Sequence, residues 1–273
     1  MTVDRRMFLT LAAGGVAAAT LVACGASGDS TGSAGAGGAD DQTSVASAGG
    51  DDPTTSGAGG VDSTSTSGDP TGTWVVSGPA DRDEVALTFH TDGPLALIEA
   101  VLDIVEARDI ALTAFVVGSW LDANPAMGDR LLAGGHELAN HSYTHPGFED
   151  LTPAQMQDEI ERCRAALDRH AGSPGRWFRP SGTDNGIDSP SAATLAAAGA
   201  AGYTAIGYDV DPVDYRDPGA RAVTDRTLAA VVPGSIVSLH MGHQGTIDAL
   251  PALLDGLAAK QLTPVSVGTL LGS

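Results

Sequence analysis

Two histidines separated by three residues, His141 and His145, form the pattern in this sequence that most directly indicates chemistry. At this spacing two imidazoles lie one helical or tight-turn step apart. Both can then approach one divalent metal, whose bonds to imidazole nitrogen are roughly 2.0–2.1 Å long. Pro146 follows at once and denies the backbone a further helical hydrogen bond, so we expect the pair to lie on a fixed turn. Ordinary surface histidines can share this spacing, so the metal site depends on what the fold brings beside it.

The elements that must position this pair follow from the apolar pattern. Strand-like runs alternate with helical patterns along the chain. We expect strands at 84–89, 111–117, 135–140, 176–179, 202–206, 235–240 and 265–267, and helices at 95–108, 124–133, 152–170, 189–198, 220–230 and 247–259. In the helix at 152–170, Thr152 is the expected N-cap and Pro153 the first helical residue. The alternation predicts a single α/β domain with about seven parallel strands in a closed or nearly closed barrel.

Polar side chains follow the predicted strands at the points where they end. Barrels of this kind place their chemistry where strands end and loops begin. Besides the histidine pair, the titratable or cationic residues at these points are His90, Asp92, Arg179, Asp211 and His240. We therefore expect these side chains to converge on one site.

The N-terminal residues 1–24 have the pattern of an export segment. Arg5 and Arg6 precede Phe8 and Leu9, which is typical of the twin-arginine route. The apolar stretch that follows is too short and too rich in small residues for a membrane span. The sequence Leu-Val-Ala-Cys-Gly around Cys24 resembles a bacterial lipobox, which implies lipidation of Cys24. The alternative is a plain cleaved signal. The lipobox predicts a protein anchored at the extracytoplasmic face of the cytoplasmic membrane.

Residues 25–72 consist almost entirely of Gly, Ser, Thr, Ala and Asp. Such a segment cannot bury enough apolar surface to offset the entropy lost on ordering, so we expect a disordered tether. The foldable domain is then 73–273. Cys163 has no partner once Cys24 is lipidated, so no disulfide framework is expected. A formal net charge of −20 argues against a nucleic-acid partner, because phosphates need cationic side chains.

Five segments, read in order, resemble the motifs of the polysaccharide deacetylase domain (NodB-type, carbohydrate esterase family four). They are Thr-Phe-His-Thr-Asp-Gly-Pro at 88–94, His-Ser-Tyr-Thr-His at 141–145, Arg-Pro at 179–180, Asp-Pro-Val-Asp-Tyr at 211–215 and Leu-His at 239–240. The resemblance covers residues 82–271. It implies a distorted (β/α) barrel that removes N- or O-acetyl groups from a polysaccharide such as peptidoglycan or a chitin-like or xylan-like polymer. It also implies a divalent metal, Zn²⁺ or a similar ion such as Co²⁺, held by an aspartate and the two pentad histidines.

The remaining motif residues take roles that agree with this chemistry. His240 fits the acid that protonates the leaving amine, and Asp211 the carboxylate that orients it. The resemblance implies that Arg179 pairs with the catalytic base. Tyr215, at a position where the family has tryptophan, is expected to form an apolar wall for the acetyl group, and Pro180 to contact substrate.

The first motif departs from the family pattern, which reads Thr-Phe-Asp-Asp-Gly-Pro with a base followed by a metal ligand. Here one residue is inserted before Gly93 and one aspartate remains. Counting backwards makes Asp92 the ligand and puts Thr91 at the base position. Counting forwards puts His90 at the base position and Thr91 at the ligand. Because threonine is a poor zinc ligand and no base near neutral pH, we expect Asp92 to bind the metal and His90 to act as base or as a fourth ligand.

Two functions therefore remain. The first is a membrane-tethered metal-dependent deacetylase. The second is a catalytically silent carbohydrate-binding lipoprotein on the same fold, which the missing aspartate favours. Ser181 and Gly182 replace a proline and an aromatic residue of the third motif, which loosens the wall that the family pattern implies for the sugar.

Overall fold

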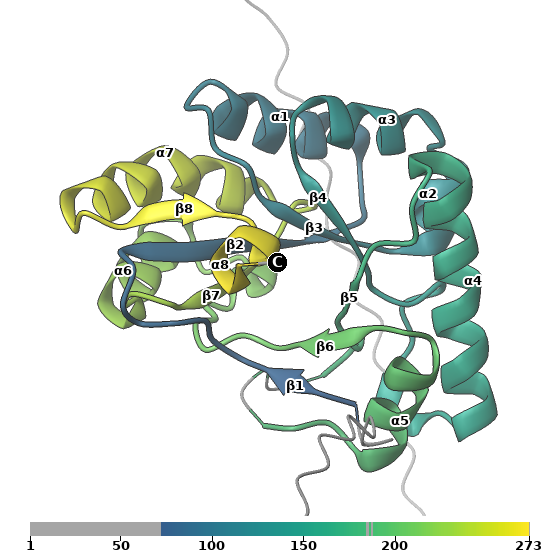
Figure 1. Cartoon of the computed structure of the whole chain (residues 1–273). Coiled ribbons are helices and arrows are strands. Elements are labelled where there is room, and N and C mark those ends of the chain that lie inside the picture. The colour runs from purple at the N-terminus through teal and green to yellow at the C-terminus, as the bar shows by residue number, and fades with distance from the viewer. Residues whose placement is uncertain (1–71, 184–185, 187, 273) are drawn as a thin grey trace, which may run out of the picture. The chain divides into compact units, whose positions relative to one another are not determined.

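A computed structural model describes residues 72–183, 186 and 188–272 (Figure 1). The predicted export segment at 1–24, its lipidated Cys24 and the tether up to residue 71 lie outside the described residues. The described residues all belong to one compact unit. No helix within them is long and apolar enough to span a membrane.

Strands and helices alternate along the described chain as the apolar pattern predicts. The strands are β1 (Trp74–Val75), β2 (Glu84–Thr91), β3 (Thr113–Val116), β4 (Glu137–Asn140), β5 (Trp177–Phe178), β6 (Thr204–Ile206), β7 (Ile236–His240) and β8 (Thr263–Val265). The α-helices are α1 (Leu95–Glu106), α2 (Gly118–Ala123), α3 (Ala126–Ala133), α4 (Pro153–Ala171), α5 (Ala192–Ala200), α6 (Ala220–Ala230), α7 (Gln244–Ala259) and α8 (Val267–Leu271). Short 3₁₀ turns lie at Phe148–Asp150 and Asp214–Arg216.

The strands form one parallel sheet in the order β1-β6-β5-β4-β3-β2-β7, with β8 also paired to β2. Isolated bridges join Ser77 to Ser235 and Val210 to Val237, so the segments after β1 and β6 meet β7. This closes the sheet into the predicted distorted (β/α) barrel. The helices surround it (Figure 1). α8 covers the end where the strands begin, since the backbone N–H of Gly268 donates to Glu137, the first residue of β4, at 2.9 Å.

Strand β2 shows how the barrel positions side chains. Its side chains alternate between two faces. Val85, Leu87 and Phe89 are fully buried in the cluster that packs against the outer helices. Ala86 belongs to the second cluster, inside the barrel, so the same alternation turns His90 inward as well. The strand extends to Thr91, beyond the predicted end at 89.

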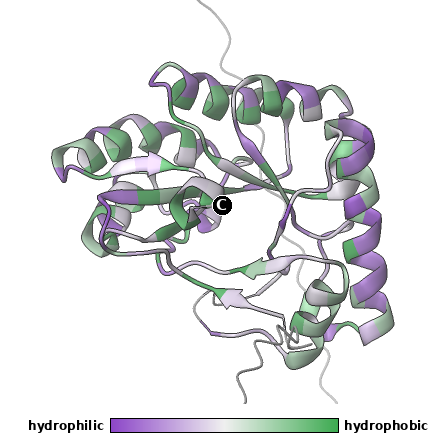
Figure 2. Ribbon diagram, in the orientation of Figure 1, coloured by the Kyte–Doolittle hydropathy of each residue, from purple (hydrophilic) through white to green (hydrophobic). Residues whose placement is uncertain are grey.

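Helix α4 packs one face against the sheet and exposes the other. Its buried residues include Met156, Ile160 and Cys163, and Figure 2 shows much of its remaining surface as hydrophilic. The predicted cap is confirmed, because the Thr152 side chain accepts from the backbone of Gln155 and the Gln155 side chain accepts in return from that of Thr152. One acidic residue, Glu159, also lies on the buried face.

The structure departs from the predicted elements most clearly in three places. Strand β1 was not predicted, because a two-residue strand shows no alternation. The helix expected at 124–133 begins two residues later, as α3, and α2, which ends at Ala123, was not predicted. The last strand lies at Thr263–Val265, and residues 267–271 form α8.

Candidate metal centre and active site

The segment His141–His145, called the histidine loop below, begins where β4 ends. The His141 side chain is fully buried. Its Nδ1 lies 2.9 Å from the carbonyl oxygen of Arg179. A carbonyl oxygen can only accept, so Nδ1 carries the proton and Nε2 keeps its lone pair. That Nε2 is buried without a hydrogen-bond partner in the described residues. Histidines that bind a metal have this arrangement, with one nitrogen fixed by a backbone carbonyl and the other free for the ion.

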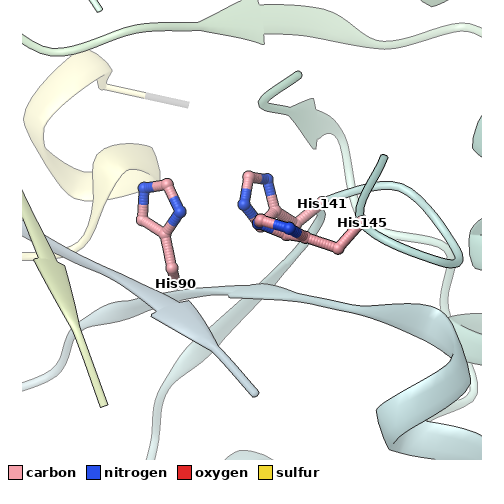
Figure 3. Close-up of side chains that lie close together, drawn as sticks. All are labelled: His90, His141 and His145. Atoms are coloured by element: carbon pink, nitrogen blue, oxygen red, sulfur yellow. The ribbon is translucent and has the colours of Figure 1, made fainter. Parts of the chain in front are cut away.

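Three imidazoles converge at this point. Ligand nitrogens of His90, His141 and His145 all lie within 4.8 Å of one another. The ring centroids of His90 and His141 are 4.4 Å apart, and those of His141 and His145 are 4.8 Å apart. Figure 3 shows the rings facing a common space. Three imidazoles are a known ligand set of catalytic zinc sites, which keep the fourth position open. The donor set and the unpartnered Nε2 of His141 therefore fit a divalent metal.

His90 enters the site through the alternation of β2. In the sheet it is opposite Phe115 of β3 and His240 of β7. Its Nε2 lies 3.0 Å from the Ser238 hydroxyl and 3.4 Å from Nη1 of Arg179. Burial, followed by the nearby His240, His141, Arg179 and His145, holds the pKa of His90 well below its usual value. The ring is therefore neutral near pH 7.

The other two candidates of the first motif lie elsewhere. Thr91 is buried on the opposite face of β2, with its hydroxyl 3.2 Å from the Phe89 carbonyl and 3.7 Å from the sulfur of Met241. Asp92 lines the same cavity as His90 but is outside the group of three nitrogen ligands. The structure thus agrees with the forward count for His90, which lies beside Arg179, but does not place Thr91 at the ligand position that this count gives it. The prediction that Asp92 is a metal ligand stays a prediction.

His240 is oriented by a different aspartate from the one predicted. Its Nδ1 lies 2.8 Å from Oδ1 of Asp214, and its backbone N–H donates to Oδ2 of the same carboxylate at 2.8 Å. The fully buried Asp214 also accepts from the Thr246 hydroxyl at 2.6 Å. Asp211 instead turns back on its own loop and accepts from the backbone N–H of Val213 at 2.7 Å, as aspartate does in turns. The assignment of Asp211 as the partner of His240 was therefore wrong.

Arg179 is a buried cation without a carboxylate hydrogen-bond partner among the described residues. Its guanidinium donates to the Thr88 hydroxyl at 2.9 Å and to the carbonyl oxygens of Ile206 and Gly207 at 3.1 and 2.9 Å. The ring of Phe115 lies 4.0 Å below it. Burial lowers the pKa of Arg179 to about 9. At the position where a base was expected, the Arg179 guanidinium approaches the His90 ring.

The site opens into a cavity of about 330 Å³. His90, His145 and His240 line it, together with Tyr208 and Tyr215. The remaining lining residues are Asp92, Gly182, Thr183 and His243. Tyr215, predicted as an apolar wall for the acetyl group, lines this cavity, and its ring centroid lies 5.1 Å from that of His240. Pro180 is buried and does not line the cavity, so the geometry does not support its predicted contact with substrate.

Sequence reasoning missed three residues of the site. Asp214 could have been found only as the second aspartate of the Asp-x-x-Asp pattern, with nothing to favour it over Asp211. His243 lies three residues after His240, with its Nδ1 3.1 Å from Asp217. Tyr208 follows β6 at a strand end, and the Arg179 guanidinium lies 5.2 Å from its ring.

Comparisons with known proteins show which proteins this chain resembles. A family model described as polysaccharide deacetylase matches residues 77–206. A chitooligosaccharide deacetylase of Bradyrhizobium sp. is 35% identical over 169 residues, which cover 58% of this chain and 71% of that protein. The solved structure of a peptidoglycan N-acetylglucosamine deacetylase has a TM-score of 0.68 at 26% identity, covering 74% of this chain and 94% of that one. The solved structure of a pseudoenzyme of family four of the carbohydrate esterases, from Bacillus anthracis, has a TM-score of 0.67 and covers 72% of this chain and 68% of that one. At 22% identity this likeness concerns the fold alone.

Proposed function

This chain belongs to the polysaccharide deacetylase family of hydrolases, and on that premise we propose that it removes acetyl groups from the amino sugars of a chitin-like polymer or of peptidoglycan. Water is added across the amide, acetate is released and the sugar keeps a free amine. The observation that carries the proposal is the group of three imidazoles, two of which line the cavity that His240 also lines. Asp214 contacts His240 from behind this ring. The names of the chitooligosaccharide and peptidoglycan deacetylases similar to this chain support the substrate class.

The residues that would hold a divalent metal are His90, His141 and His145. The unpartnered Nε2 of the buried His141 supports this assignment. An ion such as Zn²⁺ or Co²⁺, when bound, activates water and polarises the acetyl carbonyl. The chain itself keeps the buried His90 and His141 rings neutral, since burial holds the pKa of each well below its usual value. It orients His141 through the Arg179 carbonyl and His90 through Ser238 and Arg179.

His240 is the group that protonates the departing amine. Asp214 accepts from Nδ1, so Nε2 is the atom that exchanges a proton with the substrate. Tyr215, beside this ring, closes the apolar side of the cavity. The backbone N–H and the carboxylate together hold the ring in one orientation, as a general acid requires.

We assign His90 the role of third ligand. Its nitrogen belongs to the same group as the two loop histidines. Asp92, the carboxylate that lines this cavity, then accepts the proton of the attacking water. The role of Asp92 differs from the metal ligand expected from the sequence, whereas that of His90 is close to one of its two expected roles, base or fourth ligand.

A second candidate function is carbohydrate binding without catalysis. It is favoured by the first motif, in which His90 occupies the position beside Arg179 where the family has a carboxylate base. A protein of this kind would keep the metal ligands and the cavity but release no acetate.

One experiment separates the two functions. Acetate release by the purified chain is measured with Zn²⁺ or Co²⁺ on chitin oligomers, peptidoglycan and acetylxylan. We expect release from an N-acetylated substrate that stops on chelation and in His141→Ala. The control is Arg221→Ala, because the exposed Arg221 side chain contacts Asp225 within the same helix, α6. A metal-loaded wild type that binds these polymers but releases no acetate from any of them would establish the binding function.

We also propose that the protein is exported by the twin-arginine route and anchored through Cys24, with residues 25–72 as a tether to the barrel. The lipobox-like sequence supports this, and a diacylated cysteine carries the two chains that stable anchoring needs. Replacement of Cys24 by alanine should move the protein from the membrane fraction to the soluble fraction. An unchanged distribution would contradict the lipoprotein assignment.

A further inference from the structure

We propose that Glu159, on the buried face of α4, is a positioning residue that fixes the histidine loop in its metal-binding conformation. The inference rests on the proposed metal-dependent function, and it concerns a residue outside the motifs that carry the family resemblance.

The Glu159 carboxylate is hydrogen-bonded to the middle of the loop. Its Oε2 accepts from the backbone N–H groups of Tyr143 and Thr144 at 2.8 and 2.7 Å. Its Oε1 accepts from the Thr144 hydroxyl at 2.7 Å. One side chain thus satisfies three donors between the two ligands His141 and His145.

The loop needs such support because its backbone is strained. Ser142 and His145 have φ angles of 63° and 58°, a left-handed conformation that is unfavourable for residues with a Cβ. Such conformations persist only where the surroundings over-determine them. Here Asn140 Oδ1 accepts from the N–H of Ser142 at 3.0 Å. Glu159 takes the next two N–H groups, so the chain cannot relax without losing these bonds.

Neighbouring elements hold the other side of the same loop. The carbonyl oxygens of Ser142 and Tyr143 accept from the backbone of Gly118 and Ser119, at the start of α2, at 3.0 and 2.8 Å. Without Glu159, the N–H groups of Tyr143 and Thr144 would lose the charged acceptor that they share, and hydrogen bonds to a charged group are stronger than those between neutral groups. The loop would then shift, and the two imidazoles with it.

Core packing alone does not explain a carboxylate at this position. Glu159 is only 7% exposed and lies on the same face as Ile160 and Cys163. Its ion-pair partner, Arg162, is 3.8 Å away, farther than any of the three loop donors. An apolar side chain would suit the surrounding core, so the charge is explained by the donors it accepts from. Partners that orient metal ligands in this indirect way tune metal affinity.

The test measures metal binding directly in the full chain. Co²⁺ affinity is measured by competition with a chelator, and the visible absorption spectrum reports the geometry around the ion. We expect Glu159→Ala to weaken Co²⁺ binding by about 10–100-fold and to change the spectrum. In Glu159→Gln one oxygen can still accept from both N–H groups and the amide can donate to the Thr144 hydroxyl, so affinity should stay within about threefold of wild type. The control is Glu161→Ala, because Glu161 lies on the exposed side of α4 and contacts Gln157 and Arg164.

If Glu159→Ala does not fold, Glu159→Asp replaces it, because it keeps the charge but is too short to reach the loop. We expect Glu159→Asp to lose at least about tenfold in Co²⁺ affinity. Wild-type affinity and spectrum in the alanine or aspartate variant would overturn the inference while leaving the proposed function intact. If Glu159→Gln bound Co²⁺ as weakly as Glu159→Ala, the hydrogen-bond explanation would be contradicted. Absence of Co²⁺ binding by the wild type would overturn the proposed metal function and this inference together.

Discussion

The histidine loop and the end of β2 bring imidazoles to the same site by different means. The loop is irregular, and its conformation depends on acceptors from Asn140 and Glu159 and on the start of α2. The end of β2 is an ordinary strand, in which pairing with β3 and β7 decides which side chain points inward. The first region therefore tolerates little change in sequence. The second accepts a change of residue type at one position, provided that the strand register is kept.

The same contrast explains how the first motif accommodates an inserted residue. The register of β2 runs unbroken from Ala86 to His90 against β7 and from Thr88 to Thr91 against β3. The extra residue is taken up beyond the paired part of the strand, next to Gly93, whose φ of 104° suits a turn. His90 consequently takes the inward position beside Arg179, and Thr91 the outward one.

The imidazoles of His90 and His240 stack with their ring centroids 4.2 Å apart, yet their partners differ. The guanidinium of Arg179 approaches His90, and the carboxylate of Asp214 contacts His240. Neighbours of opposite charge separate the roles of two like groups. His90 is held neutral, as a metal ligand must be, while His240 has a carboxylate that orients it for proton transfer.

The largest expected effect comes from His90→Ala. Loss of a residue that only orients a ligand weakens metal affinity by about 10–100-fold. If His90 is the third ligand, its loss should weaken Co²⁺ affinity by more than this, and turnover at limiting metal should fall as well. Affinity is measured by chelator competition. If metal affinity is unchanged while turnover falls about 10²–10⁴-fold, His90 is the base instead, and the end of β2 supplies no ligand.

Asp214→Asn should have the next largest effect. The amide cannot accept from the His240 ring and backbone as the carboxylate does, so the ring loses its orientation. We expect turnover to fall by about 10²–10⁴-fold with Co²⁺ affinity unchanged. Asp211→Asn is the matched control and should cost less than about tenfold, because Asp211 bonds to its own loop. Equal losses in both variants would contradict the assignment of Asp214.

The alternation of strands and helices could be predicted because it leaves a repeating apolar pattern in the sequence. The histidine loop could be predicted because its two histidines are close in sequence. The partner of His240 could not be predicted, since Asp211 and Asp214 differ only in how the turn at Val213 directs them. Counting residues in the first motif was likewise insufficient to decide which side chain enters the site. The chemistry of the side chains favoured Asp92 as the metal ligand. Which side chain near the end of a strand points into the barrel is decided by strand register instead. Glu159 was missed because a lone glutamate in a helical pattern predicts a solvated face.

The smallest expected effect is that of Thr91→Val, and it tests the strand register itself. Thr91 stands where the forward count of the motif places a metal ligand, yet its hydroxyl contacts the Phe89 carbonyl and the sulfur of Met241. Valine keeps the branched shape and removes one buried hydroxyl, so we expect stability to change by about 1 kcal/mol and Co²⁺ affinity to stay as in the wild type. Thermal unfolding and chelator competition measure the two quantities. A marked loss of Co²⁺ affinity in Thr91→Val would mean that Thr91 faces the centre, and that register does not select His90.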